Sequence, residues 1–312
     1  MSNILVTGGA GLIGANLCKK LLTQRHEVIA VDNFITSTRK NLTQLESHPN
    51  FTFIRHDINR PFPVAMGTQM STIDYIYHLA CPTGVSNLRR LAKEILLTCS
   101  EGTKNVLELS VKTGAKVLFT SSSEVYGDPQ VFPQDETYYG NVDPVGFRSP
   151  YEEGKRFAES LVATYVQKYH IKAITVRIFN TYGPGMSEKD TRVIPQFLRQ
   201  ARREDPLTVE GKGTQTRTFC HVDDLINGLL LVMSKGKVGE IYNVGSNVEI
   251  TIINLAKLIK KLTKSHSAIQ FIARPSHDHN RRHPDLSKIR TLGWKQKISL
   301  EEGLKNTLKE HI

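Results

Sequence analysis

A tyrosine and a lysine four residues apart, Tyr151 and Lys155, have the types and spacing to act together on one substrate oxygen. Side chains four apart on a helix point to the same side. A nearby ammonium favours the phenolate form of a tyrosine and so lowers its pKa. Such a pair can remove the proton of a hydroxyl group while a hydride leaves the same carbon. A surface tyrosine beside a solvated lysine is the alternative, because this spacing is common by chance.

A run of hydroxyl side chains earlier in the chain offers a third group. Thr120, Ser121, Ser122 and Ser123 follow a predicted strand, at the edge of the sheet where strands end. A hydroxyl there can bind the same substrate oxygen as Tyr151, although three serines can also form a plain polar loop. The order along the chain, with a glycine-rich turn first, then the serines and then the Tyr/Lys pair, favours a shared site.

The glycine-rich turn lies between a predicted strand and a predicted helix at residues 7–14, Thr-Gly-Gly-Ala-Gly-Leu-Ile-Gly. Gly8 permits a sharp turn, Gly11 lets the backbone approach a pyrophosphate, and Gly14 lets the helix pack close to the sheet. The N–H groups at the start of the helix are then available to phosphates. A structural turn without a ligand is the alternative, since such turns are weak signals alone.

Asp32 strengthens the prediction of a dinucleotide site. It ends the second predicted strand about 20 residues after the turn, where an acid accepts hydrogen bonds from the adenosine ribose. Its charge would repel a 2′-phosphate, so NAD is favoured over NADP. Asp57 follows the third predicted strand and either contacts the adenine or is a turn residue.

The elements that must position these residues alternate between strand and helix, which predicts an α/β fold with a doubly wound parallel sheet of the Rossmann type. We expect residues 1–180 to form the NAD-binding domain, with a return segment at about 214–245. Residues 181–312 then form mainly a smaller C-terminal lobe that binds substrate. The expected strands are 4–7, 28–31, 51–54, 75–79, 116–120, 173–178 and 206–209, and the expected helices are 12–23, 92–113, 151–169 and 193–203.

Composition argues against several other classes of protein. Apolar residues make up 39% of the 312 residues, and no apolar run approaches the ~20 residues of a membrane span. The net charge of +11 comes from basic residues spread along the chain, so solvated helix faces are favoured over a nucleic-acid surface. The four cysteines lie far apart, which predicts a reducing, cytoplasmic location.

Taken together, these residues resemble the extended short-chain dehydrogenase family, the nucleotide-sugar epimerases and dehydratases, over nearly the whole chain. Within it, the chain is most similar to the group that decarboxylates UDP-glucuronate. The segments that carry the resemblance, besides those above, are 78–82, 123–129, 140–142, 151–156, 177–184, 215–217, 222–224 and 281–285.

The resemblance implies a role for particular residues. The catalytic residues would be Tyr151, Lys155, Ser122, Glu124 and Arg282. Residues that bind a nucleotide sugar, with UDP favoured, would be Asn180, Arg192, Val193, Arg217 and Arg282. Those at the cofactor would be Gly8, Gly11, Leu12, Ile13, Gly14, Asp32, Asn33, Phe34, Asp57, Ile58, Leu79, Ala80, Thr98, Tyr151 and Lys155. A homodimer through four helices is also implied.

The implied reaction oxidises C4 of the sugar, releases carbon dioxide from C6 and reduces C4 again. Family dehydratases carry an aspartate where Ser123 stands, and family 4-epimerases usually lack Glu124, so both remain alternatives to the decarboxylase. The loop 83–97 departs from the decarboxylases, because Leu88 replaces a tyrosine and Leu97 a lysine. This leaves the identity of the sugar open.

Two further interpretations stay open. A cluster of His277, Asp278, His279 and His283 resembles metal ligands, but the arginines around it favour anion binding, so no metal is expected. Cys81 would lie near the nicotinamide as a packing residue. A catalytically inactive NAD-fold protein that binds RNA or a partner is the non-enzyme alternative, and it gives no reason to keep the Ser/Tyr/Lys set.

Overall fold

The central sheet of the protein consists of seven parallel strands in the order β11-β6-β5-β4-β1-β2-β3. The computed structural model describes residues 1–62, 72–187, 189–275, 278–279 and 281–310. The order reverses between β1 and β4, and ligands bind at such a switch point beyond the carboxyl ends of the strands. The strands are β1 (Asn3–Thr7), β2 (Glu27–Asp32), β3 (Phe51–Arg55), β4 (Tyr75–His78), β5 (Lys116–Ser122), β6 (Ala173–Ile178) and β11 (Ile241–Val244).

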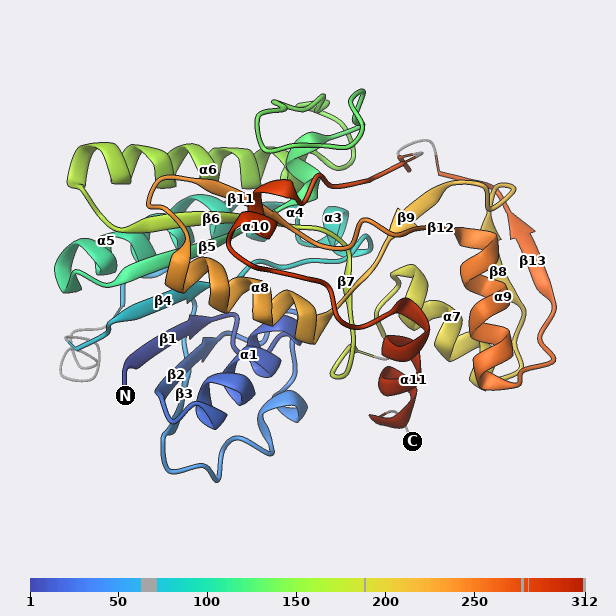
Figure 1. Ribbon diagram of the computed structural model, residues 1–312, viewed down its shortest axis with the longest axis horizontal. Helices are drawn as coiled ribbons and strands as arrows, with labels where there is room; N and C mark the ends of the chain where they lie inside the picture. Colours follow the sequence, from blue (N-terminus) through green and yellow to red (C-terminus); the bar gives the residue numbers. More distant parts are fainter. Residues whose placement is uncertain (63–71, 188, 276–277, 280, 311–312) are drawn as a thin grey trace.

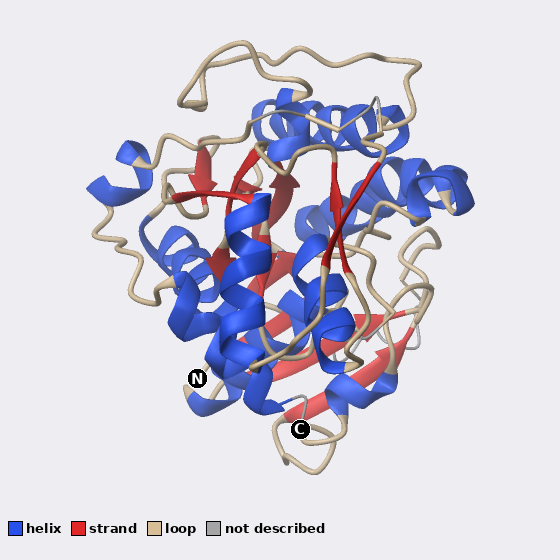
Figure 2. Ribbon diagram, turned by 90° about the vertical axis from the view of Figure 1, so that its right-hand side faces the viewer, coloured by secondary structure: helices blue, strands red, loops and turns tan. Residues whose placement is uncertain are grey.

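Helices cover both faces of this sheet (Figures 1 and 2). Successive side chains of a strand point to opposite faces. Ile4 and Val6 accordingly join the core beneath α1 and α8, while Leu5 joins the core beneath α5 and α6. Complete burial of each such side chain stabilises the fold by about 1.5–3 kcal/mol. The covering helices are α1 (Leu12–Thr23), α8 (Val222–Lys235), α4 (Ala92–Leu97), α5 (Thr103–Thr113) and α6 (Ser149–Tyr169).

A third core lies in the C-terminal part of the chain, between helices and a pair of parallel strands. Figure 1 shows these elements beside the carboxyl edge of the sheet. The elements are α7 (Val193–Arg202), β8 (Leu207–Glu210), α9 (Ile252–Thr263), β13 (Ile269–Ile272) and α11 (Leu300–Glu310). The remaining short elements are α3 (Asn87–Arg90), β7 (Thr181–Tyr182), β9 (Thr216–Thr218), β10 (Cys220–His221), β12 (Glu249–Thr251) and α10 (Ser287–Thr291).

The expected Rossmann-type fold is confirmed, and two helices differ locally from the prediction. The helix expected at 92–113 is interrupted by one π-helical turn at Thr98–Gly102. Helix α6 begins at Ser149, two residues before the start at residue 151 that the sequence predicted. Arg148 occupies the cap position, and its side chain makes no cap hydrogen bond but donates to Glu124.

The helices in the described part of the chain are all too short or too polar to span a bilayer.

Candidate active site

The turn after β1 owes its shape to glycines that meet backbone at close range. Gly8 has φ +70°, and a Cβ there would lie 2.9 Å from the backbone of Ala80. A Cβ at Gly9 would lie 2.7 Å from the Cβ of Ala30, so Gly9 lets the turn lie against β2. A Cβ at Gly14 would collide with the Gly8 carbonyl. The role expected for Gly14 is therefore corrected: it fits the helix to its own turn, and Gly9 makes the approach to the sheet.

A cavity of about 1090 Å³ opens at the start of α1. Gly11 precedes the helix without a side-chain cap, so the N–H groups of the first turn can meet a phosphate. Among the predicted cofactor residues, those that line the cavity are Gly8, Gly11, Leu12, Ile13, Gly14, Asp32, Asn33, Asp57, Ile58, Leu79, Ala80 and Thr98. Phe34, Tyr151 and Lys155 are not among its lining residues, and the Phe34 ring packs 5.1 Å from that of Phe53.

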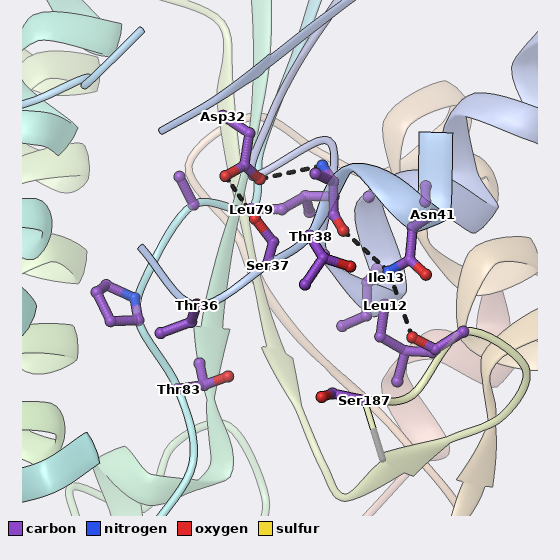
Figure 3. A pocket seen from close by; sticks show the side chains of 18 of the residues that line it. Leu12, Ile13, Asp32, Thr36, Ser37, Thr38, Asn41, Leu79, Thr83 and Ser187 are labelled. Atoms are coloured by element: carbon purple, nitrogen blue, oxygen red, sulfur yellow. Dashed lines mark hydrogen bonds between the residues drawn. The ribbon is translucent and has the colours of Figure 1, made fainter. Parts of the chain in front are cut away.

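Asp32 is fixed at the edge of this cavity by three hydrogen bonds, and Figure 3 shows the one that it accepts from Ser37. Its carboxylate accepts from the N–H of Ala10 at 3.0 Å, the N–H of Phe34 at 2.8 Å and the hydroxyl of Ser37 at 2.7 Å. Ser37 was missed in the sequence, although a serine five residues after the acid is the available signal. Asp57 both lines the cavity and accepts from the N–H of Asn59 at 3.0 Å, as a turn residue does.

The Ser/Tyr/Lys set comes together at the carboxyl end of β5. The buried Lys155 ammonium donates to the Thr120 carbonyl at 2.8 Å and lies 6.0 Å from the Tyr151 ring centre. Ser122 lies close enough to the Tyr151 hydroxyl to lower the pKa of Tyr151. Contrary to the expectation from the sequence, the pKa of Tyr151 lies above its ordinary value, because burial raises it more than the Ser122 contact lowers it.

Glu124, two residues after Ser122, is held between two arginines. Arg282 is buried and makes two contacts with the carboxylate, one of them at 2.9 Å, and the Nε of Arg148 donates to it at 3.0 Å. Burial raises the pKa of Glu124, but the two guanidiniums outweigh burial and hold this pKa well below its usual range. Glu124 is therefore an ionised carboxylate at neutral pH.

A second cavity of about 240 Å³ contains this cluster and the predicted substrate residues. Arg192 lines both cavities, so the two adjoin. Arg148 also lines the second cavity and was missed in the sequence. A cation before the first turn of a helix is unfavourable, so its position was a signal that a partner acid must exist. The predicted substrate and catalytic residues that line this cavity are Glu124, Asn180, Arg192, Val193, Arg217 and Arg282.

The members of the histidine-rich cluster that the sequence suggested contact different partners in the structure. Asp278 pairs with Arg217 and Arg274, so this acid of the loop neutralises part of the positive charge around it. His279 lies 3.3 Å from Glu152 and 3.3 Å from Asp128. Across the described residues, one group has metal-ligand geometry, namely Glu124, Glu152 and His279. The charge of Glu124 is already neutralised by two guanidiniums. His277 lies outside the described residues, and His283 is beside Glu249.

The two leucines of the divergent loop lie outside both cavities. Leu88 is buried in the core beneath α5 and α6, and Leu97 is 37% exposed. Neither is among the lining residues of the two cavities. The two leucines therefore give no structural argument against a glucuronate sugar, because neither lines a cavity that could hold the sugar.

The sheet order and its first turn define a dinucleotide-binding protein. Residues 4–245 match the NAD dependent epimerase/dehydratase family, and the chain belongs to this family. It is therefore an NAD-dependent enzyme, and NAD is the hydride acceptor. The non-catalytic alternative is not favoured. The chain is 45% identical to UDP-glucuronic acid decarboxylase 6 of Arabidopsis thaliana over 96% of this chain and 86% of that protein.

Solved structures with the same fold include two enzymes named for UDP sugars. A UDP-glucose 4-epimerase of Thermotoga maritima superposes with a TM-score of 0.89 at 30% identity, over 99% of this chain and 98% of that chain. A mutant UDP-glucuronic acid 4-epimerase of Bacillus cereus, in complex with a fluorinated UDP-glucuronic acid and NAD, gives 0.90 at 28%, over 99% and 98%. This second structure contains NAD, the cofactor on which the family depends.

The charge of Asp32 is expected to select NAD over NADP. Two unit charges about 4 Å apart near a protein surface repel by about 4 kcal/mol before solvent screening, so Asp32→Asn should weaken the preference about tenfold or more. Asparagine keeps the shape of the side chain and part of its hydrogen bonding. Titration of both cofactors measures the preference, with Glu46→Gln on the neighbouring surface as control. A wild-type protein that prefers NADP contradicts the role given to Asp32.

Proposed function

We propose that this enzyme converts UDP-glucuronate to UDP-xylose by decarboxylation through a 4-keto intermediate. The observation that carries the proposal is the ionised Glu124, clamped by Arg282 and Arg148 in the smaller cavity. Four arginines line that cavity, Arg148, Arg192, Arg217 and Arg282, which suits a diphosphate and a carboxylate. The 45% identity with a UDP-glucuronic acid decarboxylase supports the same substrate.

The residues of the chain account for the proton of the C4 hydroxyl, and the proton added at C5 is taken up from water. Tyr151, beside Ser122, accepts the proton of the C4 hydroxyl as the hydride leaves C4 for the cofactor. Lys155, held by the Thr120 carbonyl, keeps a positive charge near the developing phenolate. The new C4 ketone is β to the C6 carboxylate, so carbon dioxide leaves and its electron pair forms an enolate. Protonation at C5, return of hydride to C4 and return of the Tyr151 proton give the pentose.

Epimerisation at C4 and loss of water are the alternatives, because they share the first hydride step. The solved structures of the same fold include 4-epimerases, and their likeness supports that step and not the later ones. Ser123 stands where a dehydratase needs an acid, and it is buried beside the strand end, which argues against dehydration.

Incubation with UDP-glucuronate is expected to release carbon dioxide and give a UDP-pentose, with no net accumulation of NADH. The cofactor returns to its oxidised form in each cycle, so absorbance of NADH should stay low while product forms. Mass spectrometry of the nucleotide sugar measures the outcome, with UDP-glucose and TDP-glucose in parallel. A product of unchanged mass would mean epimerisation, and loss of water would mean dehydration; both contradict the decarboxylase.

The two lobes are proposed to divide the work. Residues 1–180, with the return segment 214–245, would bind NAD, and residues 181–312 would mainly bind the nucleotide sugar. The parallel pairing of β11 with β6 supports the return segment, because it adds a strand from beyond residue 240 to the sheet. Limited proteolysis with and without each ligand would test this division. The free state of all four cysteines supports a cytoplasmic location, which cell fractionation would test.

A homodimer through four helices is proposed from the outer surface of α4, α5 and α6. Leu96 is 44% exposed, Val111 42% and Phe157 54%, and these apolar side chains come from helices that pack against one another. A second copy would cover them and form a four-helix contact. Light scattering would give the mass in solution, and Phe157→Glu should shift a dimer toward monomer.

A further inference from the structure

Two cysteines come together where the cofactor cavity meets the catalytic helix. Cys81 follows β4 and lines the larger cavity, while Cys99 is buried in the π-helical turn Thr98–Gly102. Their sulfur atoms are 3.6 Å apart. The other two cysteines, Cys18 and Cys220, are buried in the core on the opposite face of the sheet. Only the first pair therefore combines sulfur contact with access from a cavity, as far as the described residues go.

Cys99 also contacts the helix that carries the Tyr/Lys pair. A Cβ at Gly154 would lie 3.2 Å from the Cys99 sulfur, so this sulfur packs directly against the backbone of α6 between Tyr151 and Lys155. A shift of Cys99 by an ångström or so would be transmitted to that backbone, because packed interiors leave no free space to absorb it.

The surroundings favour a reactive thiolate within the pair. The hydrogen bond from Cys81 lowers the pKa of Cys99 although burial raises it, and the nearby Lys155 ammonium lowers it further. The same contact with Cys99 raises the pKa of Cys81, so Cys99 is the one of the two thiols that ionises more readily. The thiolate is the nucleophile in cysteine oxidation, and a cation beside a thiol is the usual way to provide it.

We propose that Cys81 and Cys99 form a reversible disulfide when a peroxide enters the cofactor cavity. One sulfur attacks the peroxide, takes one oxygen as a sulfenic acid and releases the other as water. The second sulfur displaces that oxygen as a second water. Two thiols and hydrogen peroxide thus give one disulfide and two waters, and the peroxide gains the two electrons that the sulfurs lose.

The structure leaves a short distance to close. The sulfurs must approach from 3.6 Å to about 2.05 Å. The π-helical turn can supply this shift, since its irregular hydrogen bonding makes it easier to deform than an α-helix. Movement of Cys99 would displace α6 at Gly154 and misalign Tyr151. Misplacement by about 1 Å can cost on the order of 10²-fold in rate. Oxidation is thus expected to inactivate the enzyme, and a dithiol to restore it.

Treatment of the NAD-loaded protein with hydrogen peroxide tests the proposal without reference to activity. Titration of the denatured protein should show thiols falling from the four of the sequence to two, with recovery after dithiothreitol. The intact mass should fall by about 2 Da, the mass of two hydrogens. Peptide mapping should link the segments that contain Cys81 and Cys99. Because these readouts need no substrate, they can fail while the proposed decarboxylation succeeds, and the reverse.

Variants separate this pair from general oxidation. Cys81→Ala and Cys99→Ala should each abolish the linked peptide, whereas Cys18→Ala should keep it as the matched control. Cys220→Ala serves as a second control should Cys18→Ala fold poorly. Overoxidised sulfinic acids without linkage, a linkage to other cysteines, or four thiols surviving an excess of peroxide would each overturn the proposal.

Discussion

Turnover by a Tyr151→Phe variant is expected to fall by about 10²–10⁴-fold, the usual loss when a positioned acid–base group is removed. The phenol is the group whose pKa Ser122 lowers at the end of β5. Its pKa lies above the ordinary value, so a neutral tyrosine must be deprotonated within the reaction itself. Phenylalanine keeps the ring and its packing against the core beneath α6. Steady-state kinetics with UDP-glucuronate measure the loss.

The control for this variant is Tyr139→Phe, which makes the same chemical change at a different place. Tyr139 is 88% exposed and lines neither cavity. Tyr139→Phe should retain turnover, and both variants should retain NAD binding and melting temperature. Near-normal turnover of Tyr151→Phe would mean that another group removes the C4 proton. A parallel loss of NAD binding would mean that Tyr151 acts on cofactor affinity.

Local patterns in the sequence were sufficient for the sheet and the first turn. The run 4–7 is buried throughout and the run 173–178 nearly so, although Thr175 and Arg177 are polar, and burial on both faces is typical of parallel strands covered on both sides. The spacing of Tyr151 and Lys155 was sufficient to place them on one helix, since that placement depends on neighbours along the chain. These elements appear where the patterns placed them.

What the sequence did not predict depends on contacts between distant segments. Arg148 is 24 residues from Glu124 in the sequence, and Arg282 is 158 residues from it. No local sequence pattern therefore predicts that Arg148 pairs with Glu124. The raised pKa of Tyr151 follows from burial, which the spacing to Lys155 does not reveal. The contact between Cys81 and Cys99 likewise depends on how the loop after β4 folds against the π-helical turn.

Loss of Arg282 is expected to impair decarboxylation by about 10²-fold or more, the scale of a misplaced reacting group, while NAD binding is nearly unchanged. Arg282 is 5% exposed and makes two contacts with Glu124, so Arg282→Ala leaves this buried carboxylate with Arg148 as its remaining strong partner. The pKa of Glu124 should then rise from its lowered value, because one of two opposing charges is removed.

The adjacent Arg281 is the matched control. It pairs with Glu249 at the surface, with its side chain 44% exposed, so Arg281→Ala removes the same charge one position away without touching Glu124. A buried ion pair that loses one partner outright costs about 3–5 kcal/mol, and the retained Arg148 contact should reduce that cost in Arg282→Ala. Melting temperatures therefore separate unfolding from a loss of rate. Adding Glu124→Gln to Arg282→Ala should recover stability without recovering turnover, because the unpaired carboxylate is removed and Arg148 keeps Glu152 as its partner. Equal rates for Arg281→Ala and Arg282→Ala, or recovery of both rate and stability in the double variant, would show that the clamp serves the fold alone and that decarboxylation depends on other groups.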